Sequence, residues 1–397
     1  MKILWLKADF LHPTLRGGQI RTLEMLKRLH RRHEVHYVAF DDGTSAEAVA
    51  RSAEYAARAY PVSHRAPLRG SPAFWLQFAG NLFSPLPLSL ARYQDAAFRR
   101  MLQDVQRRES PDVMVCDFLT PAVNIDDLSS WVLFQHNVET MIWRRHAEHA
   151  RNPLLKLYFQ RQAERMFQVE ARVCRAVRTV IAVSENDART HQTLFGLPHV
   201  PSIPTGVDVA SLTPPGPMPG VTDLVFVGSM DWMPNIDAVD YFLDEILPLI
   251  RRRRPDCSVT IVGRRPPARL RRRAAGDLQL RVTGTVEDVR PYLWGASVSI
   301  VPLRIGGGTR LKIYESMAAR IPVVSTSIGA EGLEIHPPDD ILLADTPSAF
   351  ADACLELLAD AGARARIAQA ASDLVSSSYS WERITADFER ILFGAMN

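Results

Sequence analysis

The stretch VPLRIGGGTRLKIYESMAAR, residues 301–320, joins an apolar strand pattern to a helix pattern through three consecutive glycines. Glycine is costly inside a regular element because it loses more backbone entropy on folding than other residues. A glycine loop in front of a helix exposes successive backbone N–H groups, and the helix N-terminus adds a partial positive charge. The stretch therefore predicts an anion site of the kind that binds phosphate.

Charged side chains surround this predicted anion site. Thr309 is suited to cap the helix, and Thr309, Lys312 and Glu315 share one broad helical face because they are spaced three apart. Arg304 approaches from the end of the strand. The two cations suit a diphosphate, and Glu315 suits the vicinal hydroxyl groups of a ribose, so we expect a nucleoside diphosphate. A simple strand–helix turn, with Lys312 and Glu315 as an exposed ion pair, is the alternative.

Short apolar runs alternate with helical patterns on both sides of this stretch. Strands are predicted at 3–6, 35–40, 113–116, 132–134, 180–183, 224–227, 258–262, 280–282, 298–301, 323–325 and 341–343. Helices are predicted at 20–29, 237–250, 310–319, 347–358, 363–376 and 381–392. This alternation predicts an α/β protein with parallel sheets that helices cover on both faces.

A segment rich in proline and glycine divides the chain. IPTGVDVASLTPPGPMPGVTD, residues 203–223, has prolines at 204, 214, 215, 217 and 219, a density that does not fit inside a helix or a strand. We therefore expect two doubly wound, Rossmann-like domains, residues 1–203 and 204–380, with a further helix over 381–397.

The composition limits the classes of function. The chain has 397 residues, 47% of them hydrophobic and 23% charged, which is enough for two hydrophobic cores. A formal net charge of +3 argues against a polyanion-binding chain. Four single cysteines without a CxxC pair argue against a disulfide framework or a zinc site. Since no signal peptide or membrane-spanning stretch is evident, we expect a cytoplasmic protein.

The motifs of several common α/β proteins are absent. The first predicted strand is followed only by Gly17 and Gly18 after a long loop, which does not match the GxGxxG fingerprint of dinucleotide binding. A P-loop, a GxSxG elbow and an HExxH motif are also absent. Nucleic acid is not an expected partner, because no contiguous basic stretch with interleaved aromatic residues occurs.

The sequence resembles the family-4 (group 1) retaining glycosyltransferases of the GT-B fold over essentially its whole length. The matching segments are GGQIRTLEML (17–26), FQHNVET (134–140), VIAVSENDA (180–188), IPTGVD (203–208), FVGSMDWMPN (226–235), GTVEDVRPYL (284–293), PLRIGGGTRLKIYESMA (302–318) and YSWERI (379–384). The resemblance implies that residues 1–203 bind the acceptor, that 204–380 bind the nucleotide sugar across a cleft, and that the helix at 381–397 crosses back to the N-terminal domain.

The resemblance also implies roles for individual residues. His136, Arg304 and Lys312 would be the catalytic residues, with His136 beside the transferred sugar and the two cations on the donor diphosphate. Glu315 would hold the ribose. The remaining expected donor-binding residues are Gly17, Gly18, Arg264, Val286, Gly307, Gly308 and Thr309. No metal and no cofactor are implied, because the nucleotide-diphospho-sugar is a co-substrate.

One position departs from the family pattern. Family members commonly carry two glutamates separated by seven residues, and here Glu315 is the second while Gly307 stands at the position of the first. That first carboxylate usually contacts the hydroxyl groups of the donor sugar. The backbone N–H groups of Gly307 and Gly308 would have to replace it.

The expected activity is retaining, metal-independent transfer of a sugar from a UDP- or GDP-type donor to an acceptor hydroxyl, in bacterial cell-surface or exopolysaccharide assembly. The acceptor is expected to be a glycan, a lipid-linked glycan or a small molecule. Two alternatives stay open. One is another GT-B-fold enzyme, such as an epimerase or a phosphorylase, and the other is a non-catalytic nucleotide-sugar-binding partner.

Weaker signals surround these main candidates. Asp117 ends a predicted strand and is a second candidate beside His136, while Ser184 is expected to be an N-cap. Asn137 and Glu139 are expected to cap the next helix. The apolar segment 73–93 is interpreted either as a core helix, which we favour, or as an exposed lip at the inner face of the plasma membrane.

Overall fold

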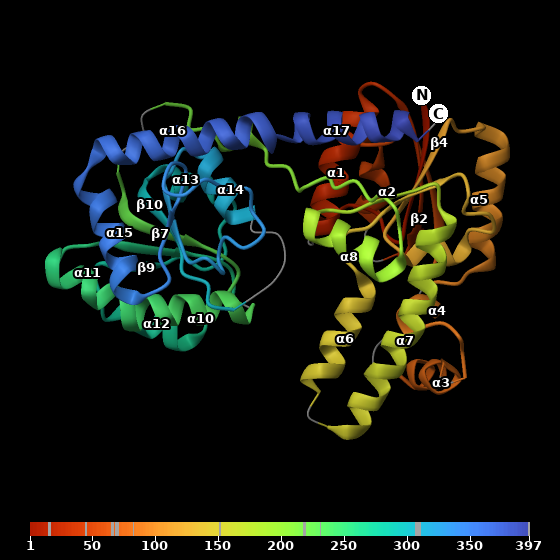
Figure 1. Cartoon of the computed structure of the whole chain (residues 1–397), viewed down its shortest axis with the longest axis horizontal. Coiled ribbons are helices and arrows are strands. Elements are labelled where there is room, and N and C mark those ends of the chain that lie inside the picture. Colours follow the sequence, from red (N-terminus) through yellow and green to blue (C-terminus); the bar gives the residue numbers. More distant parts are fainter. Residues whose placement is uncertain are drawn as a thin grey trace. The chain divides into compact units, whose positions relative to one another are not determined.

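The computed structural model describes residues 1–14, 17–43, 46–64, 67, 71–81, 83–150, 152–216, 220–230, 232–305 and 311–395. The chain divides into two compact units (Figure 1). The first unit contains Met1–Pro204 and Ile384–Asn397, and the second contains Thr205–Arg383. Each unit has a six-stranded sheet in the described part of the chain, in which every neighbouring pair of strands is parallel.

The sheet of the first unit has the order β3-β2-β1-β4-β5-β6. Its strands are β1 (Lys2–Lys7), β2 (Glu34–Asp41), β3 (Arg58–Ser63), β4 (Val113–Asp117), β5 (Trp131–Phe134) and β6 (Thr179–Ile181). Five of these were predicted and are confirmed. The strand β3 was not predicted, because its sequence RAYPVS includes Pro61, and proline is tolerated at a sheet edge such as this one.

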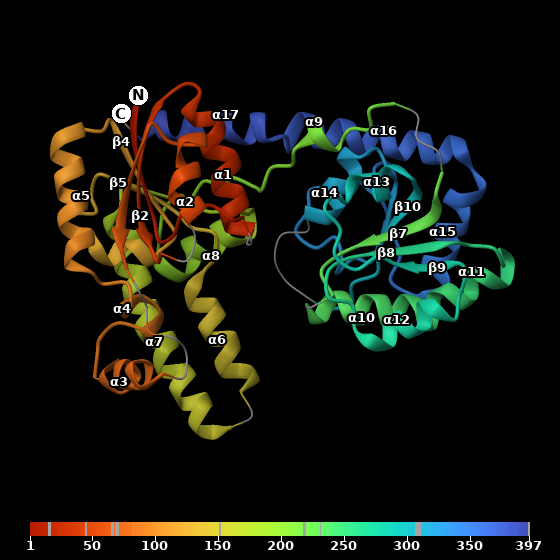
Figure 2. The same cartoon turned by 180° about the vertical axis from the view of Figure 1, so that it is seen from behind.

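Helices connect these strands and cover the sheet. They are α1 (Gly17–His30), α2 (Ala46–Ala50), α3 (Pro72–Asn81), α4 (Leu88–Ala91), α5 (Ala96–Glu109), α6 (Glu139–His149), α7 (Pro153–Ala176), α8 (Glu185–Phe195) and α17 (Trp381–Gly394). The pair α6 and α7 forms a helical hairpin that extends away from the sheet, with α3 beside α7 (Figures 1 and 2). Ser184 caps α8 as predicted, because its side chain accepts a hydrogen bond from the backbone of Asp187.

The second unit repeats the same strand order. Its sheet has the order β12-β11-β10-β7-β8-β9. When β7 is counted as the first strand and the list is read from β9 to β12, this is the same 3-2-1-4-5-6 order as in the first sheet. The strands are β7 (Thr222–Val227), β8 (Val259–Val262), β9 (Leu280–Val282), β10 (Ala296–Val301), β11 (Val323–Ser325) and β12 (Leu342–Leu343). All six lie where apolar runs predicted strands.

The helices of the second unit include one local irregularity. They are α9 (Val209–Leu212), α10 (Met233–Tyr241), α11 (Leu247–Arg253), α12 (Ala268–Ala275), α13 (Arg290–Trp294), α14 (Leu311–Ala318), α15 (Pro347–Ala359) and α16 (Ala361–Ser378). A π-helical turn over Phe242–Ile246 joins α10 to α11. The helix predicted at 237–250 is therefore one continuous helical stretch with a π-turn at its centre.

The apolar segment 73–93 divides into an exposed part and a buried part. Among the described residues of α3, Asn81 is the only buried side chain. Leu86 and Leu90, further along the segment, are buried in the core of the first unit. The core interpretation is therefore wrong for α3 and for Phe83, which is exposed, and right for Leu86 and Leu90. No helix in the described part of the chain is both long and apolar enough to cross a bilayer.

The last helix, α17, is shared between the two units. It begins at Trp381 in the second unit, and its residues from Ile384 onward belong to the first. There the fully buried Phe388 packs against Trp5, with ring centroids 5.7 Å apart, and against Phe134 at 5.1 Å. The C-terminal helix is thus part of the hydrophobic packing of the first sheet.

Truncation of this aromatic contact is expected to destabilise the first unit. Phe388→Ala should lower its free energy of unfolding by about 3–5 kcal/mol, because the substitution leaves a cavity beside two buried rings. Chemical unfolding followed by tryptophan fluorescence measures the loss. Phe393→Ala is the matched control on the same helix, since Phe393 is 44% exposed, and it should cost about 1 kcal/mol or less. Equal losses in the two variants would contradict this role of Phe388.

Candidate functional site

The strand order places a ligand-binding edge in each sheet. In open parallel sheets, ligands bind beyond the carboxyl ends of the strands, at the point where the strand order reverses. That point lies between β1 and β4 in the first unit and between β7 and β10 in the second.

A buried carboxylate organises the edge of the first unit. Asp117, the last residue of β4, is fully buried. Its Oδ2 accepts hydrogen bonds from Lys7 Nζ at 2.9 Å, Trp5 Nε1 at 3.0 Å and Thr22 Oγ1 at 2.6 Å. Its Oδ1 lies 2.9 Å from His136 Nε2. One side chain thereby ties together β1, α1, β4 and the residues that follow β5.

The carboxyl group of Asp117 is held in its ionised form. Burial by itself raises the pKa of this carboxyl group, but the ammonium of Lys7, the nearby imidazole of His136 and the hydrogen bond from Thr22 outweigh burial. The pKa of Asp117 therefore lies below its usual range. A buried Lys7–Asp117 ion pair with this many additional donors meets the requirement that buried charges are both paired and hydrogen-bonded.

His136 is a neutral imidazole in this environment. Burial lowers its pKa to about 3, although Asp117 acts in the opposite direction. Its Nδ1 lies 3.4 Å from a guanidinium nitrogen of Arg21, and its ring stacks on Phe118 with centroids 4.0 Å apart. Burial lowers the pKa of Arg21 to about 10, so the guanidinium stays protonated at neutral pH. Both ring nitrogens of His136 therefore face protein partners.

Gly17 and Gly18 form the first turn of α1, which begins at Gly17 and not at the predicted residue 20. A Cβ atom on Gly18 would lie 2.8 Å from the ring of Phe118 and 3.5 Å from His136 Nδ1. Glycine is therefore required at position 18 for the helix to approach these two rings. A Cβ on Gly17 would meet nothing within 4 Å.

The corresponding edge of the second unit is organised by a lysine. Lys312, in α14, donates a hydrogen bond from Nζ to Asn235 Oδ1 at 2.7 Å and lies 4.6 Å from the ring centroid of Phe226. Asn235 Nδ2 donates to the backbone oxygen of Ser229 at 2.9 Å. A Cβ atom on Gly228 would lie 2.8 Å from Asn235 Nδ2 and 3.0 Å from Lys312 Nζ. The absence of a side chain at Gly228 thus lets the ammonium reach the end of β7.

Glu315 lies one helical turn after Lys312 on α14 and is half-buried. Its carboxylate has no hydrogen bond or ion pair to any residue that the structure describes. Burial raises the pKa of Glu315, and the charge of Lys312 acts in the opposite direction. A half-buried acceptor of this kind suits a ligand hydroxyl group. Gly307, Gly308 and Thr309 lie outside the described residues.

Arg304 is engaged by α10 and the π-turn. Its Nε and one terminal nitrogen donate to the two carboxylate oxygens of Asp237 at 3.1 and 2.7 Å, and its other terminal nitrogen lies 3.6 Å from Glu245. The guanidinium also lies 4.3 Å from the ring centroid of Tyr241. The hydrogen bonds that Arg304 donates to Asp237 are the main reason that the pKa of Arg304 is raised. A phosphate can accept hydrogen bonds from the same guanidinium nitrogens only if the ion pair between Arg304 and Asp237 is broken.

Arg264 and Lys312 meet the same short loop after β7. Arg264 Nε donates to Ser229 Oγ at 2.7 Å, and Lys312 reaches Asn235, whose side chain bonds the Ser229 backbone. Val286, in the loop between β9 and α13, is partly buried against the core of the second unit. The structure thus connects Arg264 and Lys312 through the loop after β7.

Some residues of these edges carried a sequence signal that was not used. Lys7 is a charged residue directly after the apolar run at 3–6, and Asn235 ends the FVGSMDWMPN segment. Asn137 and Glu139 were expected to cap α6. This prediction is wrong, because neither side chain accepts a hydrogen bond from the backbone N–H groups of the first turn. The carboxylate of Glu170 in α7 accepts those hydrogen bonds, from the backbone of Glu139 at 3.0 Å and of Thr140 at 2.8 Å.

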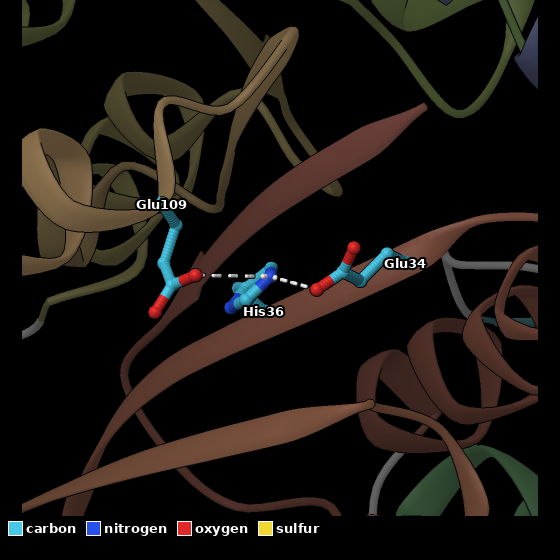
Figure 3. A group of neighbouring side chains, drawn as sticks. All are labelled: Glu34, His36 and Glu109. Carbon is cyan, nitrogen blue, oxygen red and sulfur yellow. Dashed lines mark hydrogen bonds and ion pairs between the residues drawn. The ribbon is translucent and has the colours of Figure 1, made fainter.

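Within the described residues, one group of side chains has the spacing of metal ligands: Glu34, His36 and Glu109 (Figure 3). His36 Nε2 lies 3.0 Å from Glu34 Oε1 and 3.9 Å from Glu109 Oε2. Glu109 also accepts hydrogen bonds from Arg108 Nε at 2.9 Å and from the Tyr60 hydroxyl at 3.1 Å. The group lies at the amino end of β2, opposite the Asp117 edge. We interpret it as an ion-pair cluster, because the nearby arginine competes with a cation.

Two family models match the sequence. A model described as "Glycosyltransferase Family 4" matches residues 15–211, and one described as "Glycosyl transferases group 1" matches residues 221–360. Together they span both units.

Two curated proteins resemble parts of the chain. Phosphatidyl-myo-inositol mannosyltransferase of Mycolicibacterium smegmatis is 32% identical over 222 residues, which cover 53% of this chain and 56% of that protein. An uncharacterized 44.6 kDa protein in the cps region of Klebsiella pneumoniae is 22% identical over 169 residues, which cover 41% of this chain and 44% of that protein. The chain therefore spans about half the length of the curated relatives that it matches.

The fold resembles that of solved structures over its whole length. The structure of Anabaena HepE in complex with UDP matches with a TM-score of 0.67 and 15% identity, and the match covers 99% of this chain and 100% of that chain. Together with the two parallel sheets, this likeness confirms the predicted GT-B fold.

The buried neutral imidazole of His136 predicts a pH-dependent contribution to stability. Its folded-state pKa of about 3 is below the ordinary value of 6.5. Between these values the unfolded state binds a proton that the folded state does not, so the free energy of unfolding falls as the pH falls. From pH 7 to pH 5, His136 should account for a loss of about 2 kcal/mol.

Chemical unfolding of the wild type and of His136→Gln at both pH values measures this loss. The variant cannot bind the proton in the unfolded state, so its stability should fall by about 2 kcal/mol less than that of the wild type. An identical pH dependence in the two proteins would show that His136 is not held neutral.

Proposed function

Because this chain belongs to the group 1, family-4 glycosyltransferases, we propose that it transfers a sugar from a nucleoside-diphosphate sugar to an acceptor hydroxyl with retention at the anomeric carbon. The second unit binds the donor, and the first binds the acceptor. The structural similarity to a protein solved with UDP and the sequence similarity to a mannosyltransferase support a nucleotide-sugar donor.

The observation that carries the proposal is the pairing of Lys312 and Glu315 on one face of α14. Asn235 and Gly228 hold the lysine at the reversal point of the second sheet. The half-buried carboxylate of Glu315 lies one turn away, without a donor among the described residues. In the proposal, Lys312 binds the diphosphate and Glu315 accepts hydrogen bonds from the ribose, while Arg264 and the backbone near Val286 complete the donor site.

The proposed chemistry depends on the charge that develops on the leaving diphosphate. The bond between the anomeric carbon and the diphosphate oxygen breaks, and the acceptor oxygen attacks from the same face and loses its proton to that oxygen. Lys312 and the N-terminus of α14 stabilise the departing charge, and Arg304 joins them when its pair with Asp237 opens. Since protein cations supply this charge, the proposal requires no metal ion.

In the proposal, the first unit positions His136 beside the transferred sugar. Gly18 lets the first turn of α1 approach His136, and Asp117 together with Arg21 fixes the orientation of the ring. Because His136 is neutral and both nitrogens face protein groups, we assign it a positioning role beside the sugar and not that of a base.

The proposed setting is the assembly of a bacterial cell-surface glycan or exopolysaccharide. The Klebsiella pneumoniae relative is described as a protein in the cps region, and the Mycolicibacterium smegmatis relative is named as a mannosyltransferase that acts on phosphatidyl-myo-inositol. These names support a polysaccharide or lipid-linked acceptor.

Calorimetric titration with UDP, GDP and ADP tests the donor site. One nucleotide should bind selectively, and Glu315→Gln should weaken it about tenfold, because the variant loses a charged acceptor for the ribose hydroxyls. Glu356→Gln, on the exposed face of α15 in the same unit, should leave the affinity unchanged. If no nucleotide binds the wild type, the donor site and the proposed activity are both wrong.

Removal of Lys312 tests the proposed stabilisation of the leaving group. Lys312→Ala should lower kcat about a hundredfold or more, at least as much as it weakens donor binding, because the contact strengthens as charge develops. Steady-state transfer assays, with the product's anomeric configuration read by NMR, measure both effects. Asp237→Asn is the control, since it releases Arg304 without touching Lys312, and it should keep or raise kcat/KM. A Lys312→Ala variant with a raised KM alone would contradict a role in the chemical step.

A further inference from the structure

The short helix α3 reverses the usual pattern of burial. Its sequence, PAFWLQFAGN, contains no charged residue, yet the buried side chain among its described residues is the polar Asn81. Trp75 is 57% exposed, Leu76 is 78% exposed, and Phe83 just beyond the helix is 91% exposed. An apolar helix normally buries its apolar side chains. Exposure of several large apolar residues together marks an interaction surface.

Hydrogen bonds at Asn81 fix α3 in this orientation. The backbone oxygen of Asn81 accepts a hydrogen bond from Arg165 in α7 at 2.8 Å, and its side-chain nitrogen donates to the backbone of Leu86 at 3.0 Å. The ring of Phe78 packs against Tyr158 of α7 with centroids 5.3 Å apart. The exposed apolar residues are therefore presented by a helix that is anchored to α7.

The tip of the α6–α7 hairpin carries a second set of exposed apolar residues. Asn152 caps α7, because its side chain accepts hydrogen bonds from the backbone of Leu154 at 2.9 Å and of Leu155 at 3.3 Å. In this first turn Leu154 is 78% exposed, and Leu155 and Leu157 are also exposed. Figures 1 and 2 both show α3 beside the outer half of α7, so the two apolar sets lie on neighbouring elements.

The charge of these segments is uniformly positive. Residues 71–92 and 149–161 contain no aspartate and no glutamate. Lys156 and Arg161 are exposed on α7 next to the leucines, and within the described part of the chain no carboxylate pairs with either of them. Aromatic and aliphatic side chains flanked by lysine and arginine suit the interface of a membrane with anionic headgroups.

We propose that the surface formed by Trp75, Leu76, Phe83, Leu154, Leu155 and Leu157, with Lys156 and Arg161, docks the first unit on an anionic lipid bilayer. This surface consists of the exposed part of the apolar segment 73–93, in and just after α3, together with the tip of the hairpin. The large apolar side chains enter the headgroup region, and the two cations contact lipid phosphates.

The position of the docking surface selects the acceptor class, and this step rests on the proposed transferase function. The hairpin starts at Glu139, close to His136 in the sequence, and α6 contains 11 residues. At a rise of 1.5 Å per residue, the bilayer contacted by the tip lies about 16 Å from the carboxyl edge of the first sheet. A lipid-linked glycan extends its outer sugars over such a distance, whereas its lipid stays in the membrane.

Vesicle sedimentation of the full chain tests the docking. The wild type should pellet with vesicles of equimolar phosphatidylcholine and phosphatidylglycerol, and less with phosphatidylcholine alone. The triple variant Trp75→Ser, Phe83→Ser, Leu154→Ser should lose at least about tenfold in partitioning. The double variant Lys156→Gln, Arg161→Gln should lose about fivefold in partitioning for each cation removed, and only with the anionic vesicles. Leu278→Ser is the matched control, because Leu278 is a fully exposed apolar residue of the second unit, and it should pellet like the wild type.

The outcomes separate docking from catalysis and from self-association. Unchanged melting curves and nucleotide affinity in the triple variant show that only docking was altered. A wild type that stays in the supernatant with both vesicles, or a triple variant that pellets normally, overturns the proposal. A wild-type oligomer that the triple variant dissociates assigns the surface to a second copy of the chain and also overturns it. Absence of nucleotide binding in a wild type that pellets would refute the transferase activity and leave the docking intact.

Discussion

Two parallel sheets with one strand order constrain where ligands bind in this protein. A parallel strand must be followed by a crossover, and the right-handed crossover places a helix over one face of the sheet before the next strand begins. After the third strand the chain returns to the other side of the first strand, so the crossovers on the two sides separate and leave a crevice at the carboxyl ends. In the first unit this reversal lies between β1 and β4, and in the second between β7 and β10. Asp117 ends β4, and Gly228 directly follows β7.

The two edges use polar side chains in different ways. In the first unit Asp117 is buried with Lys7, and loss of one partner of such a pair typically costs about 3–5 kcal/mol because a buried charge is left alone. The carboxylate also holds His136, so the stability of the sheet edge and the position of the imidazole depend on the same group. In the second unit Lys312 contacts a neutral amide and an aromatic ring at the end of β7.

The sequence predicts the strands well because buried parallel strands are nearly continuous apolar runs, as in WVLF of β5 and the VMVC that begins β4. The edge strand β3 was missed because Pro61 and flanking polar residues break that pattern, which an edge position tolerates. The α3 segment was wrongly interpreted as core because composition alone does not tell whether an apolar helix faces the interior or an external surface.

The candidate site was predicted in part. Lys312 and Glu315 were recognised from their spacing on one helix, since local geometry suffices for that. The pairing of Arg304 with Asp237 and the donors around Asp117 depend on contacts between residues far apart in the sequence, which periodicity does not reveal. Gly307 stands where family members commonly carry a first glutamate, and it lies outside the described part of the chain.

The central claim is that the donor nucleotide binds at the reversal point of the second sheet. Hydrogen–deuterium exchange of the full chain with and without saturating UDP, or with whichever nucleoside diphosphate binds, tests it most directly. The account predicts that protection is concentrated in peptides containing residues 226–236 and 304–316, with little change around Glu34 and Glu109 at the amino end of the first sheet. Protection confined to other parts of the second unit, with none in these two peptides, would contradict it.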